Sequence, residues 1–166
     1  MTLNGFSSHV EFTPGAQRAL LAAGRWADSA DREETTPESV LLGLLGECEC
    51  HAAAMLQRNG ITVQKVLQQW PGLRKPKDEE PTPDRASGQD VRVFSSAMQS
   101  SVDLAVEWLV KRGQPAELAS EHLLWGLLAA DHEVAQWLHQ HGLTAEMIEN
   151  ELHRLHGHLP RLDELI

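Results

Sequence analysis

The sequence is poor in the residues that favour β-strands. It contains no tyrosine and only three phenylalanines, and valine, isoleucine and threonine are sparse. No segment alternates apolar and polar residues with a period of two, which is the pattern of a half-buried strand. Leucine, alanine, glutamate and glutamine instead recur at helical spacing. We therefore predict an all-α fold.

Cysteines and long apolar runs are also scarce. The only cysteines, Cys48 and Cys50, lie too close together to link distant elements, which favours a reducing compartment. No window reaches 18 uninterrupted apolar residues, so we expect no membrane partner. The amino-terminal segment lacks a basic start followed by an apolar run. We therefore expect no secretory signal and a cytoplasmic location.

Basic residues are outnumbered, with 14 Lys and Arg against 24 Asp and Glu and a net charge of -10. An acidic chain without basic clusters gains little from counterion release, which argues against nucleic acid as a partner. The phosphate-binding pattern G-x-x-x-x-G-K-[ST] is absent, so we expect no bound ATP and no cofactor. Ser39, Ser95 and Ser120 lack a nucleophile-elbow context, and we predict that the protein is not an enzyme.

What the sequence does contain is a repeat. The string ESVLLGLLGE at 38–47 returns as EHLLWGLLAA at 121–130. Offsets of 82 or 83 residues align matched residues on both sides of this string: Phe12 with Phe94, Trp26 with Trp108, Gly43 with Gly126, Leu56 with Leu138, and Gly60 with Gly142. The matches fall on core and cap positions, which indicates a tandem duplication of about 60 residues.

Each copy divides into four helical segments. In the first copy the helices begin after Thr13, begin near Thr36, cover 51–59 and run from Thr62 to about 70. In the second copy they cover about 96–112, 121–130, 132–141 and 145–157. Threonine and serine are good N-caps, and the pairs Asn59-Gly60 and His141-Gly142 are typical of helix ends.

The repeats also define the expected domain boundaries. We expect an amino-terminal lead at 1–11, a first repeat at 12–70, a linker at 71–93, a second repeat at 94–157 and a tail at 158–166. The linker is rich in proline and charge and has no helical stripe, so we expect it to be flexible.

In register, these motifs resemble the double repeat of the Clp amino-terminal domain, found at the front of the Clp AAA+ unfoldases. The resemblance rests on Phe12-Thr13, the Glu38–Leu45 string and Leu56 to Gly60, and on their partners Phe94-Ser95, Glu121–Leu128 and Leu138 to Gly142. It implies an eight-helix bundle made of two pseudo-symmetric four-helix repeats. Because the phosphate-binding pattern is absent, it also implies a stand-alone module without the ATPase.

The resemblance further implies a non-catalytic protein-binding module. Such a module recruits substrates or adaptors to a Clp chaperone or protease, and in some members it recognises arginine-phosphorylated proteins. The matching positions here are Thr13 and Glu38 in the first copy and Ser95 and Glu121 in the second. A carboxylate can accept two N–H bonds from a guanidinium, and a helix start with a hydroxyl can hold a phosphate.

Two alternatives remain open at this point. Glu38 and Glu121 lie in first helical turns, and Thr13 and Ser95 are good caps, so helix capping alone also explains these four residues. The protein could instead be a structural accessory that regulates assembly of the Clp protease core or unfoldase, with that core or ATPase as its partner. The family usually has Thr-Glu-His at the second helix, whereas the first copy has Pro37-Glu38-Ser39.

Other residue clusters favour structural roles. Cys48-Glu49-Cys50-His51 lacks the spacing and the second ligand pair of a zinc site, so we expect free cysteines, no metal and no zinc-dependent enzyme. We interpret the carboxy-terminal histidines, which include His153 and His156, as surface residues. Trp26 and Trp108 are expected in the core. Trp125 and Trp137 occur only in the second copy, and the sequence does not decide whether they face a partner.

Overall fold

The computed structural model describes residues 10–29, 33–47, 50–73 and 93–156 of the chain. Most of the predicted linker, the tail at 158–166 and most of the lead at 1–11 lie outside the described residues. Leu73 falls inside the predicted linker but is only 4% exposed, so first-repeat packing extends at least to this residue.

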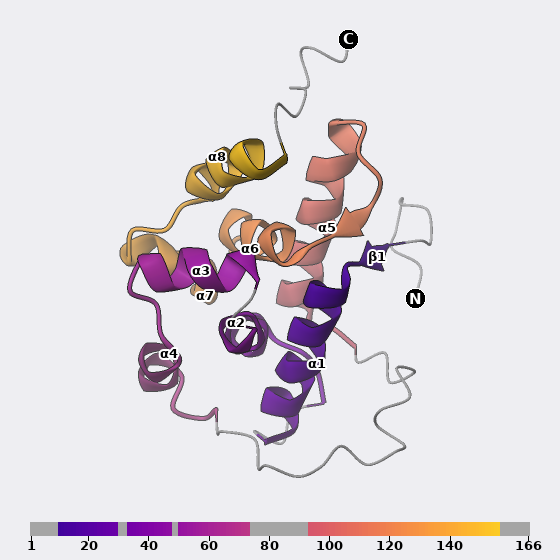
Figure 1. Ribbon diagram of the computed structural model, residues 1–166. Coiled ribbons are helices and arrows are strands. Elements are labelled where there is room, and N and C mark those ends of the chain that lie inside the picture. The colour runs from indigo at the N-terminus through magenta and orange to yellow at the C-terminus, as the bar shows by residue number, and fades with distance from the viewer. Residues whose placement is uncertain (1–9, 30–32, 48–49, 74–92, 157–166) are drawn as a thin grey trace.

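Eight helices and two very short strands occupy the described residues (Figure 1). Their bounds are α1 Pro14–Ser29, α2 Pro37–Gly46, α3 His51–Arg58, α4 Val63–Gln69, α5 Ser96–Lys111, α6 Ser120–Ala129, α7 Glu133–Gln140 and α8 Ala145–His156, with β1 Glu11–Phe12 and β2 Glu117–Leu118. The all-α fold is confirmed, and each copy of the repeat contributes four helices.

The helices begin and end at the cap residues that the sequence indicated. The Oγ1 atom of Thr13 accepts a hydrogen bond from the backbone N–H of Ala16 at 3.3 Å, and Ser95 Oγ accepts one from Met98 at 3.2 Å. At the ends of α3 and α7, Gly60 and Gly142 have φ values of 74° and 88°. A positive φ at this position is the usual way to close a helix, and glycine adopts it without strain.

The strands join the two copies, which the sequence did not predict. Residues Glu11–Phe12 of β1 pair in parallel with Glu117–Leu118 of β2. A single bridge pairs Thr35 with Phe94 in the same parallel sense. Each pair therefore joins the segment before the first helix of one copy to the segment before the second helix of the other. A two-residue strand is too short to show alternation, so no sequence pattern marked it.

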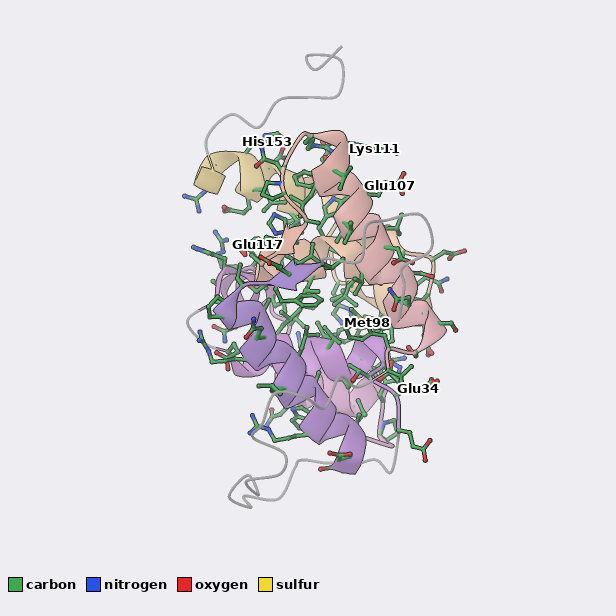
Figure 2. The ribbon with its side chains drawn as sticks, turned by 90° about the vertical axis from the view of Figure 1, so that its right-hand side faces the viewer. Glu34, Met98, Glu107, Lys111, Glu117 and His153 are labelled. Carbon is green, nitrogen blue, oxygen red and sulfur yellow. The ribbon has the colours of Figure 1, made fainter. Side chains whose placement is uncertain are left out.

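The core lies between the two copies and is centred on α2 and α6. Leu41, Leu44, Leu124 and Leu127 are all fully buried. Figure 2 shows most of the first copy in the lower part of the molecule and most of the second in the upper part, with side chains packed between them and Met98 near the level where they meet. Because α2 and α6 are surrounded on nearly all sides, they are apolar around their whole circumference rather than along one stripe.

A glycine lies at the centre of the string L-L-G-L-L in the first copy and L-W-G-L-L in the second, and it allows a very close helix crossing. A Cβ atom on Gly43 would overlap the carbonyl oxygen of Ala19 and lie 3.0 Å from the backbone nitrogen of Ala23. A Cβ atom on Gly126 would overlap the carbonyl oxygen of Ser101. Thus α2 crosses α1, and α6 crosses α5, at a separation that no residue with a side chain permits.

Among the described residues, no single helix combines the length and apolar character that a bilayer span needs; only the bent pair formed by α2 and α3 would meet both criteria together.

The substitution Gly43→Ala is expected to destabilise the fold by about 1–3 kcal/mol or more, because the obstructing atoms are backbone and cannot rotate away. Gly46→Ala is the matched control, since nothing lies within 4 Å of its Cβ position. There, alanine should be neutral or stabilising by a few tenths of a kcal/mol. Urea unfolding measures both free energies, and equal stability of the two variants would refute the close-crossing explanation.

Candidate functional site

The short strand pairs place each predicted hydroxyl beside the other copy. The backbone N–H of Thr13 donates to the carbonyl of Leu118 at 2.9 Å, directly ahead of α6. The N–H of Ser95 donates to the carbonyl of Thr35 at 3.0 Å, directly ahead of α2. Sequence reasoning assigned one hydroxyl and one carboxylate to each copy. The fold instead brings Thr13 to the helix start that carries Glu121, and Ser95 to the one that carries Glu38.

Both hydroxyls cap helices, as the capping interpretation predicted. Their oxygens accept the backbone bonds from Ala16 and Met98 described above. Accepting such a bond uses an oxygen lone pair and leaves the capacity of a hydroxyl to donate its own proton. Capping therefore accounts for the choice of Thr13 and Ser95, and it is compatible with contact to an anion.

The two carboxylates have different surroundings. Glu38 is half-buried, whereas Glu121 is only 4% exposed. An oxygen of Glu121 also lies 3.4 Å from the hydroxyl of Ser120, which donates to it. A guanidinium from another molecule could reach Glu121 only if the groups that cover it moved. The two helix starts are thus related by the repeat but are not equivalent as binding sites.

The residue after each glutamate anchors the start of its helix. Ser39 Oγ accepts from the backbone N–H of Thr36 at 2.9 Å, and His122 Nδ1 accepts from that of Ala119 at 2.9 Å. In a capping box this bond is paired with a second one, which the N-cap side chain accepts. The first copy has that second bond, from the N–H of Ser39 to Thr36 Oγ1 at 3.4 Å, whereas Ala119 has no side-chain acceptor. The serine that departs from the Thr-Glu-His pattern therefore performs the same backbone task as the histidine.

His132, which lies just ahead of α7, was not singled out from the sequence. Its Nδ1 atom caps α7 by accepting from the N–H of Ala135 at 3.1 Å, and its Nε2 atom lies 2.9 Å from Ser101 Oγ. The repeat alignment places it opposite Cys50, whose sulfur accepts from Ala53 at 3.4 Å and caps α3. The alignment of position 132 with position 50, just ahead of a predicted helix, was the feature of the sequence that could have identified His132 as a helix cap.

The contact between Ser101 and His132 does not have the geometry of a nucleophile with its base. Because Nδ1 accepts a backbone bond, the neutral ring carries its proton on Nε2 and donates it to Ser101. A catalytic base needs the opposite arrangement, with Nε2 accepting the hydroxyl proton. Ser101 is also only 1% exposed. We conclude that this pair is structural.

Burial lowers the pKa of His132, while the carboxylates of Glu38 and Asp131 act in the opposite direction and raise it. The net pKa lies below that of a histidine in water. Burial thus favours the neutral imidazole of His132, and its charge depends on pH.

The tryptophans of the second copy are anchored inside the protein. Trp108 and Trp125 donate their indole N–H groups to the same Glu149 oxygen at 3.2 and 3.0 Å. The Arg112 guanidinium lies 4.0 Å from the centre of the Trp108 ring, a cation–π contact. Trp137 is buried. Trp125 is half-buried and packs against the core, so both tryptophans whose roles the sequence left open make packing contacts. Trp26, expected in the core, is half-buried and packs against its edge.

Within the part of the chain that the structure describes, no group of three or more His, Cys, Asp or Glu side chains is placed to hold a metal ion. Cys50 is a free thiol that caps a helix, and Cys48 lies outside the described residues. His141 donates from Nδ1 to the carbonyl of Trp137 at 2.8 Å, and His139 is exposed.

Acid is expected to destabilise the fold through His132. The unfolded chain binds a proton near the ordinary histidine pKa of about 6.5, whereas the folded chain resists protonation to a lower pH. The contribution of His132 to the free energy of unfolding is therefore fully present above about pH 6.5, and it is lost as the pH drops toward the folded-state pKa. His132→Asn keeps a good cap residue but removes the titration. Urea unfolding between pH 7.5 and 5 should show a smaller loss for this variant.

The exposed His139 provides the control for that measurement, since it lies on the same helix. His139→Asn should retain the pH dependence of the unsubstituted protein. The assignment is wrong if His132→Asn and the unsubstituted protein lose the same free energy over this pH range.

Comparisons with known proteins agree with this architecture. The sequence matches the family model described as "Clp repeat (R) N-terminal domain" over residues 11–141. The crystal structure of the N-terminal domain of the caseinolytic protease associated chaperone ClpD from Arabidopsis thaliana has a TM-score of 0.61 with 23% identity. That match covers 92% of this chain and 99% of the ClpD domain, and it supports the fold.

Two relatives are longer proteins. An uncharacterised protein of Mycobacterium tuberculosis is 28% identical over 151 residues, covering 91% of this chain and 56% of the relative. The chaperone protein ClpB of the same species is 25% identical over 148 residues, covering 87% of this chain and 16% of ClpB. The chain thus spans about half the length of the first relative and less than a fifth of the second.

Proposed function

Because this chain belongs to the family of Clp repeat N-terminal domains, we propose that it is a non-catalytic module that recruits substrate or adaptor proteins to a Clp chaperone or protease in the cytoplasm. The observation that carries this proposal is the crossed arrangement of the helix starts. Twice in the fold, a hydroxyl-capped 16-residue helix begins beside an acidic helix start from the other copy.

Arginine-phosphorylated proteins are the substrate class that we propose for this arrangement. Phosphoarginine carries a guanidinium and a phosphate on one side chain. The carboxylate of Glu38 is suited to the N–H groups of the guanidinium. The start of α5, with Ser95 as its cap, is suited to the phosphate, because its backbone N–H groups and helix dipole favour an anion.

We further propose that the Glu38–Ser95 site binds more strongly than the Glu121–Thr13 site. Glu38 is half-buried, whereas Glu121 is 4% exposed and accepts a bond from Ser120. Engaging Glu121 would require that its cover be displaced, and this costs part of the binding free energy.

Glu38→Ala should weaken binding of an arginine-phosphorylated protein by about tenfold or more, since it removes a charge-assisted pair. Glu121→Ala should have a smaller effect, and the double variant should bind no better than Glu38→Ala. Isothermal titration calorimetry with one protein in phosphorylated and unphosphorylated forms measures all three affinities.

Glu107→Ala is the control for these variants, because Glu107 pairs with Lys111 near the far end of α5 (Figure 2). It should bind like the unsubstituted protein. Unchanged affinity of Glu38→Ala and Glu121→Ala, with the fold intact by circular dichroism, would reject phosphoarginine as the ligand.

The alternative, an accessory that regulates assembly of the Clp protease core or unfoldase, predicts a different set of partners. We expect affinity capture with the full chain, followed by mass spectrometry, to recover varied proteins that are Clp substrates or adaptors. Recovery of one Clp protease or unfoldase subunit in stoichiometric amount, without substrates, would support the accessory role instead.

A further inference from the structure

A shallow groove runs between α3 and α8, away from the helix starts discussed above. It has an open hollow of about 480 Å³, and an adjoining hollow of about 240 Å³ shares several of its lining residues. We call it the α3–α8 groove. The lining residues that matter here are Met55 and Arg58 from α3, Leu143 ahead of α8, and Met147, Glu151 and Arg154 from α8.

The repeat provides an internal comparison for this groove. An offset of 82 residues pairs Met55 of α3 with Trp137 of α7. The local backbone is the same at both positions, because each carbonyl accepts a bond from a side chain four residues later. Asn59 Nδ2 donates to Met55 at 2.9 Å, and His141 Nδ1 donates to Trp137 at 2.8 Å. The two sites therefore differ mainly in their side chains.

At the corresponding place between α7 and α4, two aromatic rings pack against each other. The Trp137 ring packs edge-on against Trp70, which follows α4, with ring centres 5.2 Å apart. The same offset pairs Trp70 with the buried Leu152 of α8. Two indoles, one from each copy, thus correspond to Met55 and Leu152, which also come one from each copy. Met55 forms part of the floor of the α3–α8 groove and is itself 3% exposed, whereas Met147 at the edge of the groove is 39% exposed.

The rim of the groove carries an excess of positive charge. Arg58 lies 3.2 Å from one oxygen of Glu151, and Arg154 lies 2.8 Å from the other. Two guanidiniums therefore share one carboxylate. Their side chains are 59% and 66% exposed, so their remaining N–H groups can reach a ligand. Among the lining residues, two guanidiniums therefore stand against one carboxylate, in a protein whose net charge is -10.

We propose that the α3–α8 groove is a docking site for a protein segment that presents a large aromatic side chain flanked by acidic residues. The aromatic ring lies in the hollow beside Met55 and Met147, at the place that corresponds to the Trp137–Trp70 contact. Methionine side chains adapt to such rings and make favourable sulfur–aromatic contacts. The flanking carboxylates pair with Arg58 and Arg154. An open, shallow groove suits a side chain of a protein better than an enclosed small molecule.

The test uses the full 166-residue chain and a fluorescein-labelled dodecapeptide with one central tryptophan between aspartate and glutamate residues. Fluorescence anisotropy measures affinity, and amide chemical shifts locate the contact. We expect the shifts to concentrate in α3 and α8. Replacing the peptide's tryptophan by alanine, or its acidic residues by lysine, should reduce affinity by about tenfold or more, because the central aromatic anchor and the paired charges carry most of such a contact.

Protein variants test the site directly. Met55→Trp introduces the residue found at the equivalent position of α7, Trp137. The indole should fill the groove and reduce affinity for the peptide by about tenfold or more. Leu21→Trp is the matched control: it adds an indole at a residue of α1 that is 55% exposed, and it should leave affinity unchanged. Arg154→Glu reverses a rim charge at an exposed position. It should also weaken binding, so the test stands even if Met55→Trp does not fold.

Four results would overturn the proposal, and three of these are measured with the peptide. They are chemical-shift changes that lie away from α3 and α8, equal affinity for the alanine-substituted peptide, and undiminished binding by both Met55→Trp and Arg154→Glu. Shifts of groove residues that grow with protein concentration in the absence of peptide would show that a second copy of the chain is the occupant, and they would overturn it as well. None of these measurements depends on phosphoarginine binding.

Discussion

The exchange of backbone hydrogen bonds between the two copies is the constraint on which the rest of the structure depends. The segment before α1 pairs with the segment before α6, and the segment before α5 pairs with the one before α2. These few bonds fix where four helices begin. The close crossings at Gly43 and Gly126 then hold α1 against α2 and α5 against α6. Backbone atoms make both the strand pairs and the close helix crossings. Side chains at the helix starts can therefore differ between the copies without moving the helices.

The two copies differ in the side chains at several equivalent helix starts. The side chains of Ser39 and His122 accept the same backbone bond from the residue that precedes their helix. A thiol and an imidazole start equivalent helices at Cys50 and His132. In each case the backbone bond is kept, while the chemistry presented around it differs. The result is a pseudo-symmetric frame with an asymmetric surface, in which one acidic helix start is more accessible than the other.

Much of the fold could be read from the sequence because helix ends have local chemical signatures. Thr13 and Ser95 accept bonds from residues three positions later, and Gly60 and Gly142 relieve strain at a single residue. Burial was less predictable. Glu121 and Glu38 occupy equivalent positions in similar strings, yet one is almost fully covered and the other is not. Exposure depends on which neighbours pack over a residue, and no local pattern encodes these neighbours.

The sequence by itself determined that the chain is helical, that it is duplicated, and where most helices start and stop, since each of these features depends on contacts within a few residues. Only the tertiary structure decided which segment of one copy pairs with which helix start of the other, and that Met55 lines a hollow beside α8 while Trp137 packs against Trp70. These arrangements join residues from different copies of the repeat. They follow from how two similar halves pack together, and the covalent order of the chain does not specify that packing locally.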